Sequence, residues 1–152
     1  MTRVVDTIKV VELLEAEISG SILEHAQNEL FVDPNKIFEI AALLKDHEAL
    51  ELGYLTSITA VDYIEYFQIV YHLYSTTHKH KLVLKISVPP EEPKVKSVIS
   101  IWPSSDWFER ESHDLFGVLF DGHPDMSPLL LYDGFEGYPG LKSFDFHDYT
   151  EW

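Results

Sequence analysis

The sequence predicts an α+β protein, with a mainly antiparallel sheet of three to five strands, helices packed on one side and an irregular C-terminal tail. Three observations predict this class. Apolar residues recur at helical spacing in two stretches before residue 47, three stretches between residues 54 and 88 are rich in β-forming or alternating residues, and no period is visible beyond Pro124. We expect one domain over residues 1–125 and an extension over residues 126–152 that docks on a partner protein.

The N-terminal third is predicted to form a helix, two short strands and a second helix. The first helix covers Val4–Ile18, and Gly20 follows it as a stop signal. Short strands are predicted at Ile22–Ala26 and Glu29–Val32. The second helix covers Asp33–Asp46, where an N-cap aspartate and a first-turn proline precede an amphipathic pattern.

The middle of the chain is predicted to be an antiparallel meander. Its strands are Tyr54–Tyr63, Glu65–Ser75 and Lys81–Val88, which short polar turns connect. The proline-rich segment Pro89–Pro93 is expected to end the meander as an exposed loop. We expect Ser97–Trp102 to be a brief strand or extended segment.

A third helix is predicted over Asp106–Phe116. Asp106 is its expected N-cap, with Glu109 as the returning partner of a capping box, and Gly117 suits the left-handed residue that ends a helix. The four-residue spacing predicts pairing of Arg110 with Asp114 and of Glu109 with His113.

The charged residues of this region allow two interpretations. Carboxylates and imidazoles are ligands for zinc or iron, so a metal or acid–base site is one of them. Its candidate residues are Glu109, His113, Asp121, His123 and Asp125. The favoured interpretation is an ion-pair cluster that positions the helix, because Arg110 compensates the carboxylates and the second histidine of an H-E-x-x-H motif is missing.

The tail after Pro124 carries many large apolar groups without a period. They include Leu129, Leu130, Leu131, Tyr132, Phe135, Tyr138, Leu141, Phe144, Phe146, Tyr149 and Trp152. Monomers rarely leave large apolar patches exposed, so such a segment either wraps its own domain or lies along a partner. The interpretation favoured here is a partner.

Composition excludes several functions. The formal net charge of −15 disfavours binding to nucleic acid or directly to anionic lipid. The sequence has no cysteine, which excludes thiolate-ligated iron–sulfur clusters, cysteine zinc sites and thiol nucleophiles. Glycine-rich phosphate loops and a G-x-S-x-G elbow are absent, and no apolar run is long enough to insert into a membrane.

The third helix and the corner after it carry a family resemblance. Residues 109–116 read E-R-E-S-H-D-L-F, and His123-Pro124-Asp125 follows six residues later. This series resembles the signature of the C subunit of NADH:quinone oxidoreductase, the thirty-kilodalton subunit of respiratory complex I. The same family includes related domains of membrane-bound hydrogenase complexes. The signature residues, which the resemblance assigns to a partner interface, are Glu109, Arg110, Glu111, Asp114, Leu115, Phe116, Gly122, His123, Pro124 and Asp125.

The resemblance extends over about residues 30–145. Residues 55–63, 70–75 and 100–103 are similar to the family's first two meander strands and to its approach to the helix, and residues 134–139 resemble its tail. The chain departs from the family at Ser127 and Pro128, where two arginines are usual, at Tyr138, where histidine is usual, and near Leu141-Lys142, where a basic pair is usual. The chain is therefore not expected to make the contacts of the basic groups that it lacks.

The resemblance implies a subunit without a redox centre, cofactor or catalytic residue of its own. Such a subunit lies in the hydrophilic arm, on the cytoplasmic side of the cell membrane, and packs on the large quinone-site subunit near the adjacent iron–sulfur subunit. The equivalent subunit of a hydrogenase-type complex is one alternative, and nothing in the chain distinguishes NADH from ferredoxin as electron donor. A small metal-dependent hydrolase using Glu109, His113 and His123 is the alternative from another class.

Overall fold

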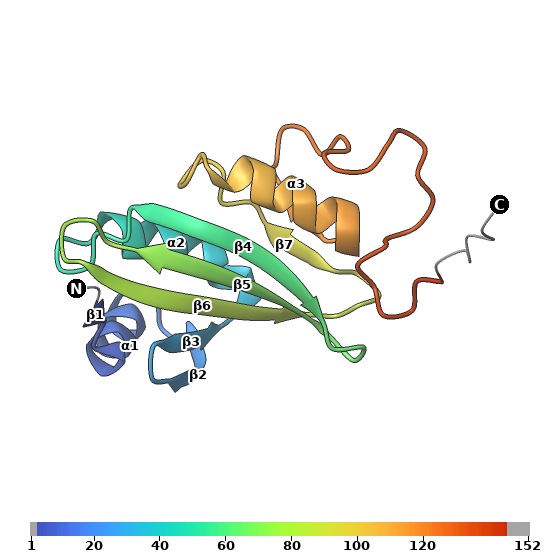
Figure 1. Ribbon diagram of the computed structural model, residues 1–152. Coiled ribbons are helices and arrows are strands. Elements are labelled where there is room, and N and C mark those ends of the chain that lie inside the picture. Colours follow the sequence, from blue (N-terminus) through green and yellow to red (C-terminus); the bar gives the residue numbers. More distant parts are fainter. Residues whose placement is uncertain (1–2, 146–152) are drawn as a thin grey trace.

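The computed structural model describes residues 3–145 (Figure 1). Its main sheet has six strands: five follow the order β2-β3-β6-β5-β4, and the two-residue β1 pairs with β6. The α+β class, the mainly antiparallel sheet and the irregular tail are thereby confirmed. The sheet has one strand more than the upper limit expected, because the Arg3–Val4 pair adds to the side of β6.

The predicted meander forms the centre of the sheet. β4 covers Tyr54–Asp62, β5 covers Phe67–Tyr74 and β6 covers His80–Val88, and both pairings are antiparallel. In β5 the side chains of Phe67, Ile69, Tyr71 and Leu73 are buried, as the alternation predicts. One face of the sheet therefore carries the core.

Helices supply the rest of this core. α2 (Ile37–Asp46) follows a short 3₁₀ turn, Pro34–Lys36, in which Asp33 caps the amide of Asn35 as expected. α1 (Thr7–Glu17) begins three residues later than predicted and contributes the fully buried Val10 and Leu14. α3 (Ser105–Phe116) lies beside β4 (Figure 1).

The two predicted N-terminal strands form a hairpin at one side of the sheet. β2 (Ile22–Ala26) and β3 (Glu29–Val32) pair in antiparallel fashion around Gln27 and Asn28. β3 then runs parallel to β6, with Leu30 opposite Leu84. The strand pattern predicts β3 itself but gives no information on this long-range parallel pairing.

The expected strand at Ser97–Trp102 is wrong. This segment is turn-like, and the strand lies earlier, at β7 (Lys94–Lys96), which pairs in parallel with β8 (Leu119–Asp121) as a second small sheet. The segment turns because Trp102 is a core residue: its ring is buried and its indole N–H donates to the carbonyl of Leu52 at 3.1 Å.

The tail leaves the end of β8 and runs along α3 before it returns toward the β4–β5 turn (Figure 1). Between Gly122 and Asp145 it contains no helix or strand. Phe146, Tyr149 and Trp152, which are part of the predicted partner-binding tail, lie outside the described residues. The boundary predicted at residue 125 stays a prediction.

Candidate interaction site on the third helix and the tail

The side chain of Glu109 lies inside the protein, with no exposed area. One carboxylate oxygen accepts a hydrogen bond from the Ser97 hydroxyl at 2.5 Å and the other accepts from the Val98 amide at 2.9 Å. Burial raises the pKa of Glu109, and the bonds from Ser97 and Val98 only partly offset this effect. Glu109 therefore fixes α3 to the turn before it.

The predicted capping box is thus wrong. α3 begins one residue earlier, at Ser105, so Asp106 lies in the first turn and makes no cap, and Glu109 points into the core instead of back to the helix start. The carboxylate of Asp106 instead faces His123, whose Nε2 lies 3.2 Å from Asp106 Oδ1 and 4.0 Å from Glu109 Oε2.

His123 is held between the helix and the corner that follows β8. Its side chain has no exposed area, and its Nδ1 accepts the amide N–H of Asp125 at 3.1 Å. In the neutral ring this bond places the proton on Nε2, toward the two carboxylates. The short Nε2–Asp106 contact lacks hydrogen-bond alignment, so it is an electrostatic contact.

Tyr71 also lies near Glu109, although the sequence pattern assigns it only to the buried face of β5. Its hydroxyl is buried and has no hydrogen-bond partner among the described residues. Burial, together with the nearby Glu109 carboxylate, raises the pKa of Tyr71 well above its ordinary range. Alternation along β5 predicts that Tyr71 is buried, but no local signal predicts that it lies near Glu109.

Arg110 contacts the tail and not Asp114, so that predicted pair is wrong. Its guanidinium donates to the carbonyl oxygens of Ser127 and Pro128, at 3.2 and 3.1 Å, and to the Ser127 hydroxyl at 3.2 Å. Asp125 accepts the Ser127 amide at 2.9 Å, and hydrogen bonds from Ser127 lower the pKa of Asp125. Arg110 therefore holds the start of the tail.

Asp114 holds the next part of the tail. Its Oδ2 accepts three consecutive amide N–H groups, those of Leu129 and Leu130 at 2.8 Å and that of Leu131 at 3.3 Å. Burial raises the pKa of Asp114, but the three amides outweigh this effect and hold the pKa below its ordinary value. The Oδ2 atom of this carboxylate is thus satisfied by backbone amides.

The remaining signature residues have simpler positions. Leu115 and Phe116 are half-buried, and the Leu115 carbonyl accepts the amide of Gly140 at 2.8 Å. Gly122 has a positive φ of 88° in the turn before His123, while Pro124 is exposed. Glu111 is half-buried and makes no hydrogen bond or ion pair with the described residues.

Asp62 is a tail-holding residue that sequence reasoning missed. Its Oδ2 accepts the Lys142 amide at 2.9 Å and its Oδ1 accepts the Ile64 amide at 2.7 Å. These two bonds lower the pKa of Asp62. An aspartate at the end of a strand before a turn is a local signal for the bond to Ile64. The bond to Lys142 joins positions 80 residues apart.

The alternative metal site is not assembled. Glu109 and His123 lie close together, but the predicted Glu109–His113 pair is wrong, because His113 Nδ1 instead contacts the Val118 carbonyl at 3.0 Å. Asp121 is exposed beside Lys94 at 3.9 Å. Among the described residues no group of three or more histidine, aspartate or glutamate side chains could hold a metal ion.

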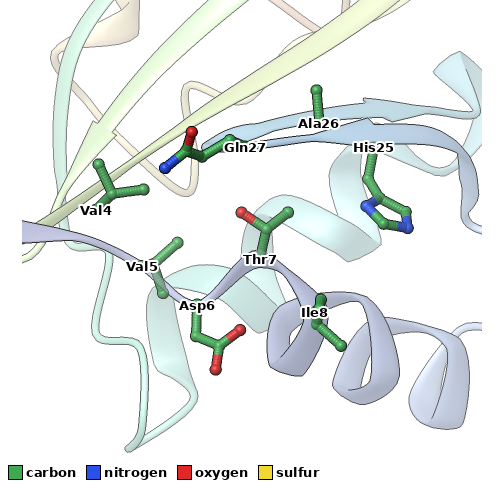
Figure 2. Close-up of a pocket in the computed structure, with 8 residues that line it drawn as sticks. All are labelled: Val4, Val5, Asp6, Thr7, Ile8, His25, Ala26 and Gln27. Carbon is green, nitrogen blue, oxygen red and sulfur yellow. The ribbon is translucent and has the colours of Figure 1, made fainter.

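A hollow of about 560 Å³ lies apart from this region, between the start of α1 and β2 (Figure 2). Its lining includes Val4, Val5, Ile8 and Ala26, and Figure 2 shows Asp6 directed away from Gln27. A binding site normally has several polar groups that converge on one position. Four of the eight lining residues here are polar (Asp6, Thr7, His25 and Gln27), and the Thr7 hydroxyl already accepts the Asn28 amide at 3.0 Å. Within residues 3–145, no helix is long and apolar enough to cross a membrane.

The fold and the site define an α+β protein whose buried charged groups hold backbone segments in place. The family model described as respiratory-chain NADH dehydrogenase, 30 Kd subunit, matches residues 30–150. The chain belongs to this family.

Curated relatives agree with the family match, and each of them is a C subunit of NADH-quinone oxidoreductase. The chain is 38% identical over 123 residues to the C 2 subunit of Rhizobium meliloti, a match that covers 79% of this chain and 67% of that protein. It is 34% identical over 144 residues to the C subunit of Roseiflexus sp., covering 90% and 83%. It is 44% identical over 133 residues to the C subunit of Dinoroseobacter shibae, covering 84% of this chain and 61% of the relative.

Two solved structures share the fold. A trypsin-resistant fragment of Nqo5 superposes with a TM-score of 0.61 at 29% identity, covering 78% of this chain and 98% of the fragment. A chain of the membrane-bound sulfane sulfur reductase, an archaeal respiratory membrane complex, superposes with a TM-score of 0.76 at 25% identity, covering 93% and 86%.

Proposed function

We propose that this chain is a non-redox assembly subunit of the peripheral arm of an NADH:quinone oxidoreductase. It packs on the large quinone-site subunit, near the adjacent iron–sulfur subunit, on the cytoplasmic side of the membrane. The chemistry of electron transfer then takes place in other chains, and this chain has no catalytic residue and no cofactor. Family membership across residues 30–150, with relatives that are NADH-quinone oxidoreductase subunits, is the observation that carries this proposal.

The tail supplies structural support. Leu130, Tyr132 and Tyr138 are 58%, 72% and 40% exposed, although the segment that carries them is fixed by Asp114 and Arg110. Large apolar groups held at the surface of an ordered segment are typical of a protein interface. A fixed segment also loses less conformational entropy when it binds.

The charged signature residues support a structural role. Glu109, Arg110 and Asp114 each bond to the protein's own backbone or hydroxyl groups. A buried carboxylate bonded in this way holds a backbone segment in position. The signature then describes the attachment of the tail, and the exposed tail side chains make the contact.

A second candidate is the equivalent subunit of a related membrane complex. The sulfane sulfur reductase chain superposes over 93% of this chain, more than the Nqo5 fragment does. The sequence relatives, at 34–44% identity, are NADH-quinone oxidoreductase subunits and favour the first candidate. The identity of the large subunit that accompanies the chain distinguishes the two.

Co-purification tests the proposal. The tagged chain is expressed in its own host, membranes are solubilised in mild detergent, and the captured subunits are identified by mass spectrometry. We expect the large quinone-site subunit to be recovered with the chain. A Leu130→Ser/Tyr132→Ser variant is expected to lose most of it, whereas Ile8→Ser/Leu23→Ser, which changes apolar residues 62% and 69% exposed on other elements, is the matched control.

The outcomes are distinct. Recovery of the chain only as a free species contradicts the proposal. Equal recovery of the large subunit with both double variants leaves assembly in place but removes the tail from the interface. Recovery of a large subunit of a hydrogenase or sulfur reductase, without NADH-quinone oxidoreductase subunits, supports the second candidate.

A further inference from the structure

We infer that a small pocket between α3 and the tail receives a single arginine side chain of the partner protein. This inference rests on the proposed function and names the chemistry of one contact within it. The pocket has a volume of about 190 Å³ and is lined by His113, Asp114, Met126, Tyr132, Phe135 and Tyr138, among others. Pockets for cofactors and small substrates usually measure about 300–1,000 Å³. A single side chain fits a space of this size.

Four of the ten residues that line the pocket carry aromatic rings: His113, Tyr132, Phe135 and Tyr138. Tyr132 packs edge-on against Phe135 with ring centroids 5.3 Å apart, and Tyr138 packs edge-on against His113 at 6.4 Å. Phe135 also stacks on Phe144 at 6.0 Å, so the tail segment is held by its own rings. Ring faces attract a guanidinium group through cation–π contact and stacking.

A carboxylate forms part of the same wall. Asp114 is 6% exposed, and its Oδ2 accepts all three tail amides, so Oδ1 has no hydrogen-bond donor among the described residues. His113 donates from Nδ1 to the Val118 carbonyl, which leaves Nε2 as an acceptor in the neutral ring. Both groups suit a donor-rich cation.

Charge around the pocket selects the same occupant. Asp133 and Glu136 are exposed on the tail segment next to the lining residues, and neither makes an ion pair with the described residues. Between residues 129 and 141 the tail has no basic residue. Arg110, the nearest cation along α3, has its guanidinium on Ser127 and Pro128. Pro128 lines the pocket, so Arg110 is one cation at its edge, set against the three carboxylates of Asp114, Asp133 and Glu136. A cation entering the pocket therefore meets net negative charge, which steers binding and sets orientation.

Arginine fits this combination better than lysine or leucine. Its planar guanidinium stacks on rings and donates to a carboxylate in the same pose, whereas an ammonium group is a strongly hydrated point charge. Arginine residues in aromatic, largely desolvated pockets are frequent energetic centres of interfaces. The inferred contact is thus an anchor for the partner at the point where the tail meets α3.

The probe is N-acetyl-arginine amide, titrated into the purified, isotopically labelled chain and followed by amide NMR. We expect saturable shifts centred on Gly134, Gly137 and Tyr138, with weaker binding of N-acetyl-lysine amide and N-acetyl-leucine amide. Tyr132→Leu should weaken arginine binding about two- to fivefold, the size of an exposed cation–π contact. Tyr54→Leu changes a tyrosine that is 57% exposed on β4 and should leave it unchanged.

Three results overturn the inference: no shifts at the pocket with the arginine probe, equal or stronger binding of the leucine probe, or equal loss in Tyr54→Leu and Tyr132→Leu. Asp114 is not varied, because it also holds the tail. Failure here is distinguishable from failure of the proposed function. A chain that binds the arginine probe but captures no large subunit refutes the function, and the converse refutes only the pocket's occupant.

Discussion

Glu109 and Asp114 lie on the same helix, yet their surroundings shift their pKa values in opposite directions. Glu109 is fully buried and is met by one hydroxyl and one amide, so desolvation dominates and its pKa rises. Burial also acts to raise the pKa of Asp114, but three amides meet that carboxylate and leave its pKa lowered. The first carboxylate joins α3 to the core, and the second joins α3 to the tail.

Replacing Glu109 separates its hydrogen bonds from its charge. We expect Glu109→Ala to lower the free energy of unfolding by about 2–4 kcal/mol, because the Ser97 hydroxyl and the Val98 amide lose their acceptor inside the protein. Glu109→Gln retains an acceptor and removes a poorly solvated carboxylate, so a change within about 1 kcal/mol is expected. Urea unfolding measures both, and Glu12→Ala on the exposed face of α1 is the control.

Asp114 makes attachment of the tail dependent on pH. Its folded pKa is depressed, so its contribution to stability is complete above the unfolded value of about 4 and is lost as pH falls through the folded pKa. Hydrogen exchange measures this loss. We expect the protection factors of the Leu129, Leu130 and Leu131 amides to fall as the pH is lowered below the unfolded value of about 4.

The Asp114→Asn variant completes that test. An amide oxygen is a weaker acceptor than a carboxylate, so protection of the three leucine amides should be low already at neutral pH and nearly independent of pH. Asp133→Asn changes an exposed aspartate of the same tail and should behave as the unchanged chain. Protection in Asp114→Asn equal to that of the unchanged chain would show that the carboxylate does not hold the tail.

At the scale of elements, α3 ends where its glycine is needed. Gly117 has a φ of 75°, and its amide bonds the His113 carbonyl at 2.8 Å. A Cβ at this position would lie 2.7 Å from the Tyr138 ring. The left-handed end of α3 and the close approach of the Tyr138 ring therefore both require a glycine at position 117.

Gly117→Ala is expected to cost about 1–2 kcal/mol for the left-handed backbone, and about 1 kcal/mol more for displacement of Tyr138. Gly122→Ala provides the matched control, because Gly122 has a φ of 88° but nothing within 4 Å of the added carbon. The difference between the two variants in urea unfolding isolates the contact with the ring. Equal losses would mean that Tyr138 moves aside without cost.

Local patterns predicted the elements well and their tertiary partners poorly. Gly117 ends α3 as predicted, and the alternation in β5 correctly predicts its buried face. Each of these features depends only on residues that are neighbours in the sequence. Helical spacing showed that Arg110 and Asp114 share a face, but both found partners in the tail. A spacing rule considers only residues one helical turn apart, so it cannot predict partners that lie 15–18 positions away in the tail.

The same reason explains the misplaced segment before α3. Ser97 to Trp102 contains β-forming residues, yet Ser97 and Val98 turn to meet Glu109, and Trp102 enters the core. Here long-range burial outweighs local strand preference. The signature pattern predicts α3 and the corner after it as the site. It does not predict Asp62, because the contact of Asp62 with the tail joins residues 80 positions apart.

For the whole molecule, the distribution of the core indicates which part of the chain folds by itself. Every fully buried apolar residue of the core cluster lies at or before Phe120. From the tail only Met126 and Leu141 pack against that cluster within the described residues, and both are partly buried. The tail is therefore attached mainly by hydrogen bonds to Asp114, Arg110, Leu115 and Asp62, and adds little to the apolar core.

A chain ending at Asp125 tests this division between fold and interface. We expect residues 1–125 to unfold cooperatively in urea, with a free energy of unfolding about 2–4 kcal/mol lower, because two partly buried side chains and the amides bound to Asp114 are lost. The full-length chain, unfolded in the same urea series, is the reference for this difference. Since the exposed apolar side chains Leu130, Tyr132 and Tyr138 are removed, the shorter chain should fold yet recover no large subunit from membranes. Non-cooperative unfolding of residues 1–125 would instead make the tail an integral part of the domain, and assembly of the folded shorter chain would place the interface elsewhere on its surface.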